Sequence, residues 1–181
     1  MCPDTELAGP TFTTLASPVG ELFLTSNGTA LTGLYPASHP GLPDTSGMTR
    51  DDALFAGIRD QLNAYFRGKL SEFKVPLKPA GTAFQEIVWQ QLCRIPCAAT
   101  RTYGEVAAAI GRPSASRAVG AAVAKNPILI IIPCHRVVGS SGAPTGYSGG
   151  LELKKWLFEH EAAMLPVRMA PAERAPSVSF S

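Results

Sequence analysis

Cys134 and His135 lie side by side where an apolar segment of the chain ends, in the sequence Pro133-Cys134-His135-Arg136. A cysteine in this position can be core filler, a metal ligand, half of a disulfide or a nucleophile. A nucleophilic thiol attacks as the thiolate, and a neighbouring base or positive charge lowers its pKa. His135 offers the base and Arg136 the charge, so this pair of residues could perform nucleophilic chemistry.

The expected backbone sets a condition on that chemistry. The five aliphatic residues 128–132 predict a buried strand that leads to the cysteine. Consecutive residues of a strand point to opposite faces, so His135 reaches the Cys134 sulfur only through a bend or a bridging water. Pro133 is suited to making that bend.

Glu161 is the carboxylate best placed to orient such a base. It lies on a predicted helix over residues 151–164, on the apolar face that Leu153 and Leu157 mark. A carboxylate on an apolar face needs a partner, or its pKa shifts. A hydrogen bond from the second imidazole nitrogen would satisfy it and fix the base. On these residues alone, packing remains the commoner explanation of a Cys-His pair.

The other cysteines do not indicate a disulfide framework or a metal site. Cys2 is isolated, and Cys93 and Cys97 lie four residues apart on a predicted helix without a histidine pair nearby. We interpret Cys93 and Cys97 as buried small apolar residues. We expect no metal ion in the protein.

The second half of the chain predicts three helices before the cysteine. The first spans about residues 82–95, with Thr82 as its cap and Pro96 as its stop. Thr102 and Glu105 have the spacing of a capping box for a second helix, which Gly111 would end. A third helix follows over residues 116–125, and the last two have helix-turn-helix dimensions.

The third of these helices is slender, because alanines and Gly120 make up half of it and Arg117 is its one long basic side chain near the start. A slender helix can enter a narrow surface such as the DNA minor groove, although small residues can also serve close helix packing. Residues 94–155 carry eight Lys/Arg against two Asp/Glu, which favours an anionic partner. Scattered solvated charge is the alternative explanation.

Residues 1–80 contain no chemical motif and are interpreted as a scaffold domain. They predict a β-hairpin or meander over residues 11–35 with a turn at Asn27-Gly28, then a helix from about Arg50 to Phe66 and a strand at Phe73–Leu77. The fold class is therefore α+β, with an antiparallel sheet in residues 1–80 and a mainly helical domain with an active-site strand in residues 81–164.

The remaining features bound the class of protein. Residues 165–181 are rich in proline and predict a flexible tail. No apolar run approaches the length that spans a membrane, and the N-terminus lacks the pattern of a secretory signal. We expect a cytoplasmic protein.

At this point the residues carry a resemblance. The segment from Pro133 to Gly139 (PCHRVVG), the segment Arg117-Ala118-Val119-Gly120, Asn126-Pro127 and the segment from Gly146 to Gly150 (GYSGG) together resemble the O6-alkylguanine-DNA alkyltransferase family. The similarity is dense over residues 82–161, and residues 1–80 are similar to the family's small α/β domain only in outline. The resemblance implies a protein that repairs DNA by moving the alkyl group of O6-alkylguanine to its own cysteine, once per molecule.

The resemblance also implies a role for each matching residue. Cys134 would accept the alkyl group, His135 would be the water-mediated base, and Glu161 would orient it. Asn126 would tie the helix-turn-helix to the active-site strand, and Tyr103 would protonate the departing guanine. The remaining residues would bind DNA or the flipped base. Arg117 would be the finger that fills the gap in the base stack, with Ala118 and Gly120 beside it, and Tyr147 and Ser148 would lie on the loop that closes over the base. Arg136 and Lys154 complete this set.

The implied partner is double-stranded DNA, approached from the minor groove, with no cofactor, no membrane and no obligate protein partner, and the protein would act as a monomer. Two rival functions stay open: a winged-helix-like DNA-binding module with a structural cysteine, and a Cys-His hydrolase with Glu161 completing a triad. Relatives with tryptophan in place of the cysteine bind alkylated DNA without repairing it, and Cys134 argues against that subgroup.

Overall fold

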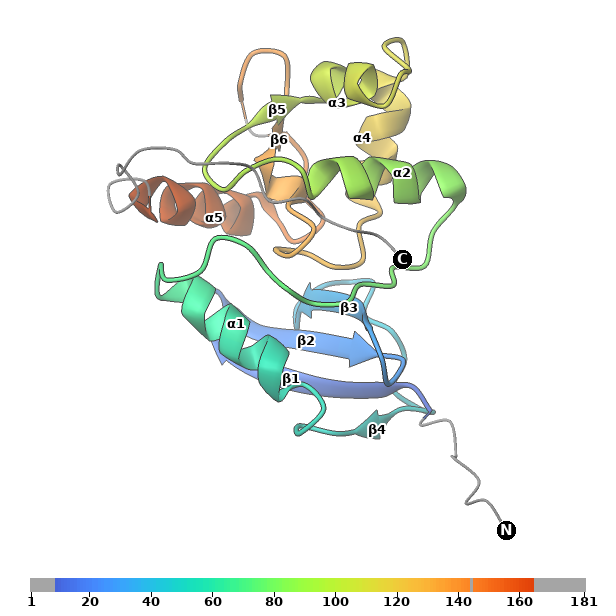
Figure 1. The fold of residues 1–181 in the computed structure, drawn as a ribbon, viewed down its shortest axis with the longest axis vertical. Coiled ribbons are helices and arrows are strands. Elements are labelled where there is room, and N and C mark those ends of the chain that lie inside the picture. The colour runs from blue at the N-terminus through green and yellow to red at the C-terminus, as the bar shows by residue number, and fades with distance from the viewer. Residues whose placement is uncertain (1–8, 144, 165–181) are drawn as a thin grey trace.

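The structure is a computed structural model that describes residues 9–143 and 145–164. The predictions made for Cys2 and for the tail over residues 165–181 lie outside the described residues. Figure 1 shows two parts, the sheet lobe (residues 9–78) below the helical lobe (residues 83–164). The predicted α+β fold is confirmed.

The sheet lobe begins with the expected meander. Strands β1 (Thr11–Ser17), β2 (Gly20–Ser26) and β3 (Leu31–Pro36) are antiparallel, and a two-residue strand, β4 (Thr49–Arg50), pairs parallel to β1. The sheet order is β3-β2-β1-β4. The three long strands are antiparallel, as predicted, and the parallel pairing of β4 is the one departure from that prediction. The turn at Asn27-Gly28 forms because the Asn27 side chain accepts two backbone N–H groups and Gly28 adopts φ +94°.

Helix α1 (Ala56–Phe66) lies across one face of the sheet and buries Leu62 and Tyr65 (Figure 1). It begins later than the expected start at Arg50. Residues 52–55 form turns instead, in which the Asp51 carboxylate accepts the backbone N–H groups of Ala53 and Leu54.

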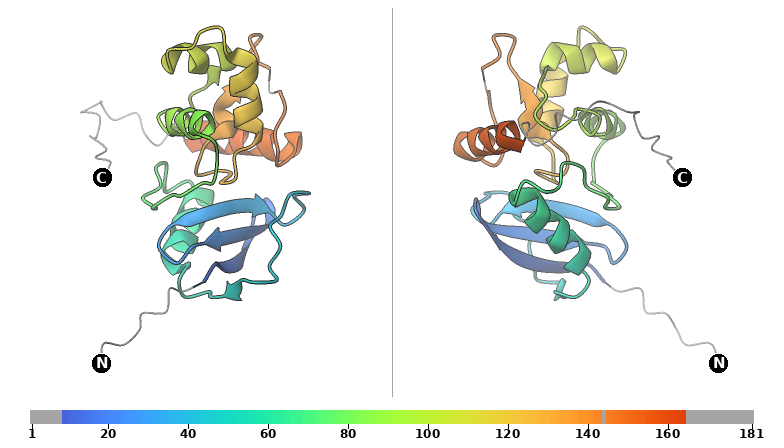
Figure 2. Two further views of the ribbon diagram at one scale, coloured as in Figure 1. Left: turned by 90° about the vertical axis from the view of Figure 1, so that its right-hand side faces the viewer. Right: turned by 60° about the vertical axis from the view of Figure 1, so that its left-hand side comes forward.

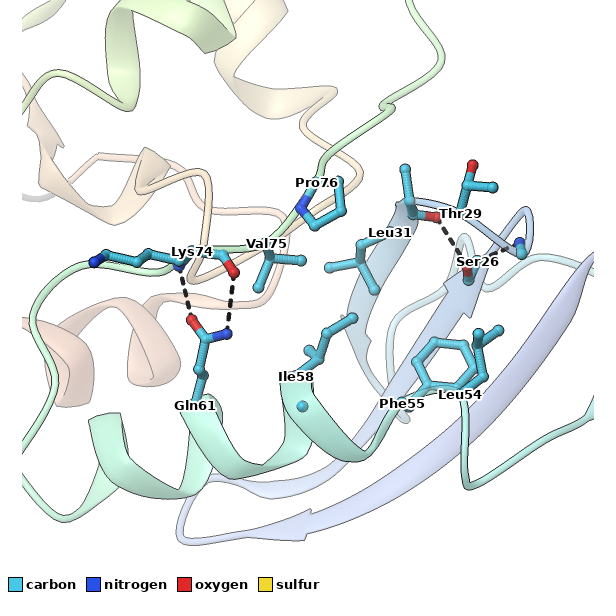
Figure 3. A pocket seen from close by; sticks show the side chains of 13 residues that line it. Ser26, Thr29, Leu31, Leu54, Phe55, Ile58, Gln61, Lys74, Val75 and Pro76 are labelled. Carbon is cyan, nitrogen blue, oxygen red and sulfur yellow. Dashed lines mark hydrogen bonds between the residues drawn. The ribbon is translucent and has the colours of Figure 1, made fainter. Parts of the chain in front are cut away.

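The connection from α1 to the helical lobe runs back along the sheet lobe. Phe73–Leu77 forms only an isolated bridge from Leu77 to Leu31, so the predicted strand there is wrong. Instead, the Gln61 side chain donates to and accepts from the backbone of Lys74 and holds this segment against α1 (Figure 3). The hollow drawn in Figure 3 lies between α1, this segment and the β2–β3 turn, and none of the predicted site residues lines it.

The helical lobe contains the expected helices. These are α2 (Ala83–Leu92), α3 (Tyr103–Ala109), α4 (Ser116–Ala124) and α5 (Leu151–Met164), with a two-residue parallel pair of strands, β5 (Arg101–Thr102) and β6 (Val137–Val138). Thr82 and Thr102 form the capping boxes of α2 and α3 with Gln85 and Glu105. Figure 2 shows α3 at the end of the molecule farthest from the sheet, with α4 next to it.

Two residues of the first predicted helix lie elsewhere than expected. The helical spacing of Phe84, Ile87 and Val88 predicts that they share an apolar face, but Ile87 is 44 % exposed. Cys93, interpreted as buried, is exposed at the end of that helix. The core side of α2 is formed by Val88, Trp89 and Leu92, and the Trp89 indole donates to the Ala122 carbonyl of α4 at 2.9 Å. Helices α2 and α4 are thus joined through a buried hydrogen bond.

The predicted active-site strand over residues 128–132 is wrong. This segment is buried, but it forms turns, and Ile130 adopts φ +71°. The Asn126 side chain explains the turns, because its Oδ1 accepts from the Ile128 N–H at 2.9 Å and its Nδ2 donates to the Ile132 carbonyl at 2.9 Å. The Asn126 side chain therefore stabilises the turns in this apolar segment, and the spacing of apolar residues in the sequence could not indicate this.

The sheet lobe contacts this segment directly. The Leu34 N–H of β3 donates to the Pro127 carbonyl at 2.9 Å, and the Leu129 N–H donates back to Leu34 at 2.9 Å. One cluster of buried apolar residues runs through both lobes, from the sheet to α5. Within residues 9–143 and 145–164, no helix is long and apolar enough to cross a membrane.

The capping box at Thr82 gives a testable stability difference. We expect Thr82→Ala to lower the free energy of unfolding by about 1 kcal/mol, since the N–H of Gln85 loses its acceptor. Thr82→Ser keeps the hydroxyl and should unfold close to wild type. Urea denaturation of the three proteins measures this, and equal midpoints for Thr82→Ala and wild type would contradict the cap.

Candidate active site

The Cys134 thiol is buried at the start of a short 3-10 helix, Cys134–Arg136, with 1 % of the residue exposed. The Asn126 Nδ2 donates to Cys134 Sγ at 3.0 Å. Since Asn126 lies two residues after the end of α4, one side chain connects the helix-turn-helix to the thiol. The sequence pointed to Asn126 as a link between these elements, but gave no sign of its direct contact with sulfur.

The surroundings of the thiol keep it protonated at neutral pH. Burial raises the pKa of Cys134 to about 11, against the opposing effects of the Asn126 hydrogen bond, the Lys154 charge and the Tyr147 hydroxyl. The positive charge near the thiol comes from Lys154, whereas we expected it from Arg136. A protonated thiol is a weak nucleophile, so attack requires a base.

His135 is positioned as that base by Glu161. The His135 Nε2 lies 2.8 Å from Glu161 Oε1, and both side chains are buried. Burial lowers the pKa of His135 despite the hydrogen bond and charge of Glu161, so the imidazole is neutral. Because a carboxylate only accepts, Nε2 carries the proton and Nδ1 presents its lone pair.

The Glu161 carboxylate receives several other donors. Arg136 donates from Nε to Oε2 at 2.9 Å and from Nη2 to Oε1 at 2.8 Å, the Ala98 N–H donates to Oε2 at 2.9 Å, and the Tyr65 hydroxyl donates to Oε1 at 3.0 Å. Burial alone would raise the pKa of Glu161, but the hydrogen bonds and charges of His135 and Arg136 hold it well below its usual range. The carboxylate is therefore ionised.

This pairing removes Arg136 from the predicted DNA-binding set. Its guanidinium is buried, and it also donates from Nη1 to the Ile95 carbonyl. A side chain held in this way cannot reach DNA, so the expected DNA contact of Arg136 is corrected to an ion pair inside the protein.

Lys154 is also buried rather than available to a ligand at the surface. Its Nζ donates to the Val137 carbonyl at 2.6 Å and to the Thr145 carbonyl at 2.8 Å. It thus joins α5 to β6 and to the loop over residues 139–150. The structure places Lys154 beneath that loop, which it supports, and its expected contact with substrate stays a prediction.

Three buried polar atoms in the described residues lack a hydrogen-bond partner of good geometry, and all three belong to predicted site residues. They are His135 Nδ1, the Tyr147 hydroxyl and Ser148 Oγ. Buried polar atoms are rarely left unpaired in native proteins, so an unpaired atom requires an explanation. Atoms that bond a substrate or a water during a reaction provide one.

Tyr103 and the helix-turn-helix lie on the outer side of this loop. The Tyr103 hydroxyl accepts from Thr145 Oγ1 at 3.3 Å, and its ring faces Gly120 of α4. Arg117 and Ala118 are exposed on α4, while Val119 and Val123 are buried. The small residues of α4 therefore serve both the exposed face and the packing.

No group of three His, Cys, Asp or Glu side chains in the described parts of the chain could hold a metal ion.

Comparisons with known proteins agree with this arrangement. The family described as "6-O-methylguanine DNA methyltransferase, DNA binding domain" matches residues 83–163, and its "ribonuclease-like domain" matches residues 11–79. The "Methylated-DNA--protein-cysteine methyltransferase" of Mycobacterium bovis is 48 % identical over 155 residues, which are 86 % of this chain and 94 % of that protein. The protein of that name from Methanosarcina barkeri is 45 % identical over 148 residues, 81 % of this chain and 94 % of the other.

A solved structure gives the same result. The crystal structure of Mycobacterium tuberculosis OGT in complex with DNA has a TM-score of 0.81 and 47 % sequence identity, covering 85 % of this chain and 94 % of that one. Fold and site thus define a class of DNA-binding proteins with a buried reactive cysteine. The chain belongs to the O6-alkylguanine-DNA alkyltransferase family, also described as the 6-O-methylguanine DNA methyltransferases.

The buried ion pair gives a stability prediction. We expect Glu161→Gln to lower the free energy of unfolding at pH 7 by about 3–5 kcal/mol, because Arg136 is left buried without its counter-charge. Since the folded pKa of Glu161 is lowered, its contribution is complete above the unfolded pKa of about 4.3 and declines as pH falls below it. Denaturant unfolding at several pH values should show the difference between the variants shrinking at acidic pH.

Glu159→Gln is the matched control for that experiment. Glu159 is on the same helix, is 68 % exposed and lies 4.0 Å from Lys155. Its removal should change the unfolding free energy by less than about 1 kcal/mol. Equal effects of the two substitutions would contradict the role of Glu161 as a buried counter-ion.

Proposed function

We propose that this protein repairs alkylated DNA by transferring the alkyl group from O6 of a guanine to Sγ of its own Cys134. The observation that carries the proposal is the buried Cys134 thiol, which accepts a hydrogen bond from Asn126. His135 is the next residue in sequence, and its Nε2 is paired with Glu161, which leaves Nδ1 available to accept a proton. DNA is the partner of this family member, and O6-alkylguanine is the lesion that we propose for it.

The proposed reaction begins with the loss of the thiol proton. A water between Cys134 Sγ and His135 Nδ1 passes the proton to the imidazole, and Glu161 stabilises the resulting positive charge. The thiolate attacks the saturated carbon, so that an S–C bond forms as the C–O6 bond breaks and its electron pair returns to the guanine. Tyr103 donates a proton to the guanine and takes one back from solvent, while the protonated His135 releases its proton to solvent. The net result is that the thiol proton moves to the guanine.

The loop over residues 145–150 supplies contacts to the base in this proposal. The Tyr147 hydroxyl, which lies near Cys134, and Ser148 Oγ are buried polar atoms that a base entering from DNA could bond. Donors aimed at the atom on which negative charge develops lower the barrier most effectively. The thioether product is a poor leaving group, and we therefore propose a single turnover for each protein molecule.

The damaged base must leave the duplex to reach a buried sulfur, at a cost of a few kcal/mol for unstacking. The exposed Arg117 on α4, with small exposed neighbours such as Ala118, suits insertion into the stack from the minor groove. We propose residues 81–164 as the domain that binds DNA and transfers the alkyl group, and residues 1–80 as its support. Action as a monomer in the cytoplasm, without a cofactor, stays a prediction from the sequence.

Incubation with an oligonucleotide duplex that contains O6-methylguanine tests the transfer. We expect one methyl group per protein on the Cys134 peptide by mass spectrometry, and no further demethylation when DNA is in excess. Cys134→Ala should abolish transfer while its affinity for the duplex stays close to that of wild type. Tight binding without transfer would favour the DNA-binding module, and repeated turnover of an ester substrate would favour the hydrolase.

Arg117→Ala tests the flipping step separately. We expect transfer from duplex DNA to slow by about tenfold or more, since the side chain no longer offsets the unstacking cost. Transfer from the free base O6-methylguanine, which needs no flipping, should keep its wild-type rate. Lys125→Ala removes a charge at the other end of α4 and should have the smaller effect on duplex DNA, so an equal loss in both variants would indicate general charge attraction instead.

A further inference from the structure

Tyr65 connects the sheet lobe to the carboxylate of the candidate active site. It is fully buried on α1, and its hydroxyl donates to Glu161 Oε1 at 3.0 Å across 96 residues of sequence. Oε1 is also the oxygen that lies 2.8 Å from His135 Nε2. The phenol and the imidazole therefore share one acceptor atom.

The position of the phenol is fixed from both lobes. His160, the residue before Glu161 on α5, lies with Nε2 2.8 Å from the Tyr65 carbonyl, and its ring packs edge-on against the Tyr65 ring with centroids 5.1 Å apart. Trp156 stacks on His160, and Phe73 of the sheet lobe packs against the Tyr65 ring with centroids 5.4 Å apart. Since α5 holds Tyr65 immediately beside Glu161, the hydroxyl is directed at the carboxylate with little freedom to move.

The other carboxylate oxygen has its own fixed donors. Glu161 Oε2 accepts from Arg136 Nε at 2.9 Å and from the Ala98 N–H at 2.9 Å. Ala98 adopts φ +61°, a left-handed conformation that is unfavourable for a residue with a Cβ atom. With donors on both oxygens, the carboxylate cannot rotate without losing a hydrogen bond, so the plane that holds His135 is defined.

We propose that Tyr65 is a positioning residue for alkyl transfer, whose phenol fixes the Glu161 carboxylate that orients His135. This rests on the proposed function, and it gives the sheet lobe a part in the reactive centre beyond support. The phenol acts in two ways. It holds Oε1 in the direction of the imidazole. Its hydrogen bond also stabilises part of the negative charge on Oε1, which would otherwise act only on His135 and Arg136.

Removal of the phenol hydroxyl therefore has a defined chemical consequence. In Tyr65→Phe, Oε1 loses a donor and its charge acts more strongly on His135, which favours the protonated imidazole. A protonated imidazole cannot accept the thiol proton, so the acid limb of the rate profile moves to higher pH. The charged and titratable groups that face this pair from the other elements are Arg136, Cys97, Tyr147, His160 and Lys154, and all of them remain in the variant.

The experiment compares wild type, Tyr65→Phe and Tyr35→Phe in single-turnover methyl transfer from duplex DNA between pH 5 and 9. Tyr35 is a half-buried tyrosine of the same lobe that packs on His39, so its hydroxyl is a matched control. We expect transfer by Tyr65→Phe to be slower by about tenfold, as is usual for residues that orient a reactive side chain, with the acid limb displaced to higher pH. Duplex affinity should stay within about twofold of wild type, which is 0.4 kcal/mol or less at about 1.4 kcal/mol per tenfold.

The outcomes separate the two proposals. If wild type transfers no methyl group, the proposed function falls. If wild type transfers and Tyr65→Phe has the same rate and pH profile, Tyr65 is not a positioning residue. A slower Tyr65→Phe with an unshifted pH profile, or with reduced DNA affinity and a lower unfolding midpoint that Tyr35→Phe does not share, would also overturn the proposal, since both results indicate a structural role only.

Discussion

The charge of the Glu161 carboxylate is held inside the protein, where 2 % of the residue is exposed, and this requires donors from three separate parts of the chain. An ionised carboxylate without partners in the interior would cost many kcal/mol. The donors come from α1, from the turn after α2, and from the two residues that follow the cysteine, and α5 carries the carboxylate itself. Much of the arrangement of the two lobes follows from bringing these segments to one point.

The same pairing decides which charges act on the thiol. Because Glu161 neutralises Arg136, the positive charge that favours the thiolate of Cys134 is that of Lys154, yet burial outweighs it and the thiol stays protonated. A protonated thiol does not react with small electrophiles at random. His135, neutral and with a free Nδ1, is then the group that can activate the sulfur when an electrophile is in place.

The sequence predicted the elements that depend on local signals. Three such predictions are confirmed: the capping boxes at Thr82 and Thr102, the turn at Asn27-Gly28 and the burial of Glu161. Each of them depends on residues that lie close together in the sequence. The strand predicted over residues 128–132 was wrong, since an apolar run indicates burial and not conformation, and the Asn126 side chain determines the turn. The proposed roles of the site residues stay predictions.

Contacts between distant segments could not be predicted in this way. Tyr65 and Ala98 carry no motif, and only the folded chain brings them to Glu161. The resemblance implied that Arg136 and Lys154 bind DNA or the flipped base, and their partners inside the protein became visible only with the fold. Leu34 pairs with the residues that follow Asn126, and Tyr65 bonds the carboxylate that holds His135 and Arg136. The segment from Asn126 to Arg136, which contains the thiol, is therefore supported by the sheet lobe at both of its ends, and a displacement of that lobe would disturb the cysteine and its base together.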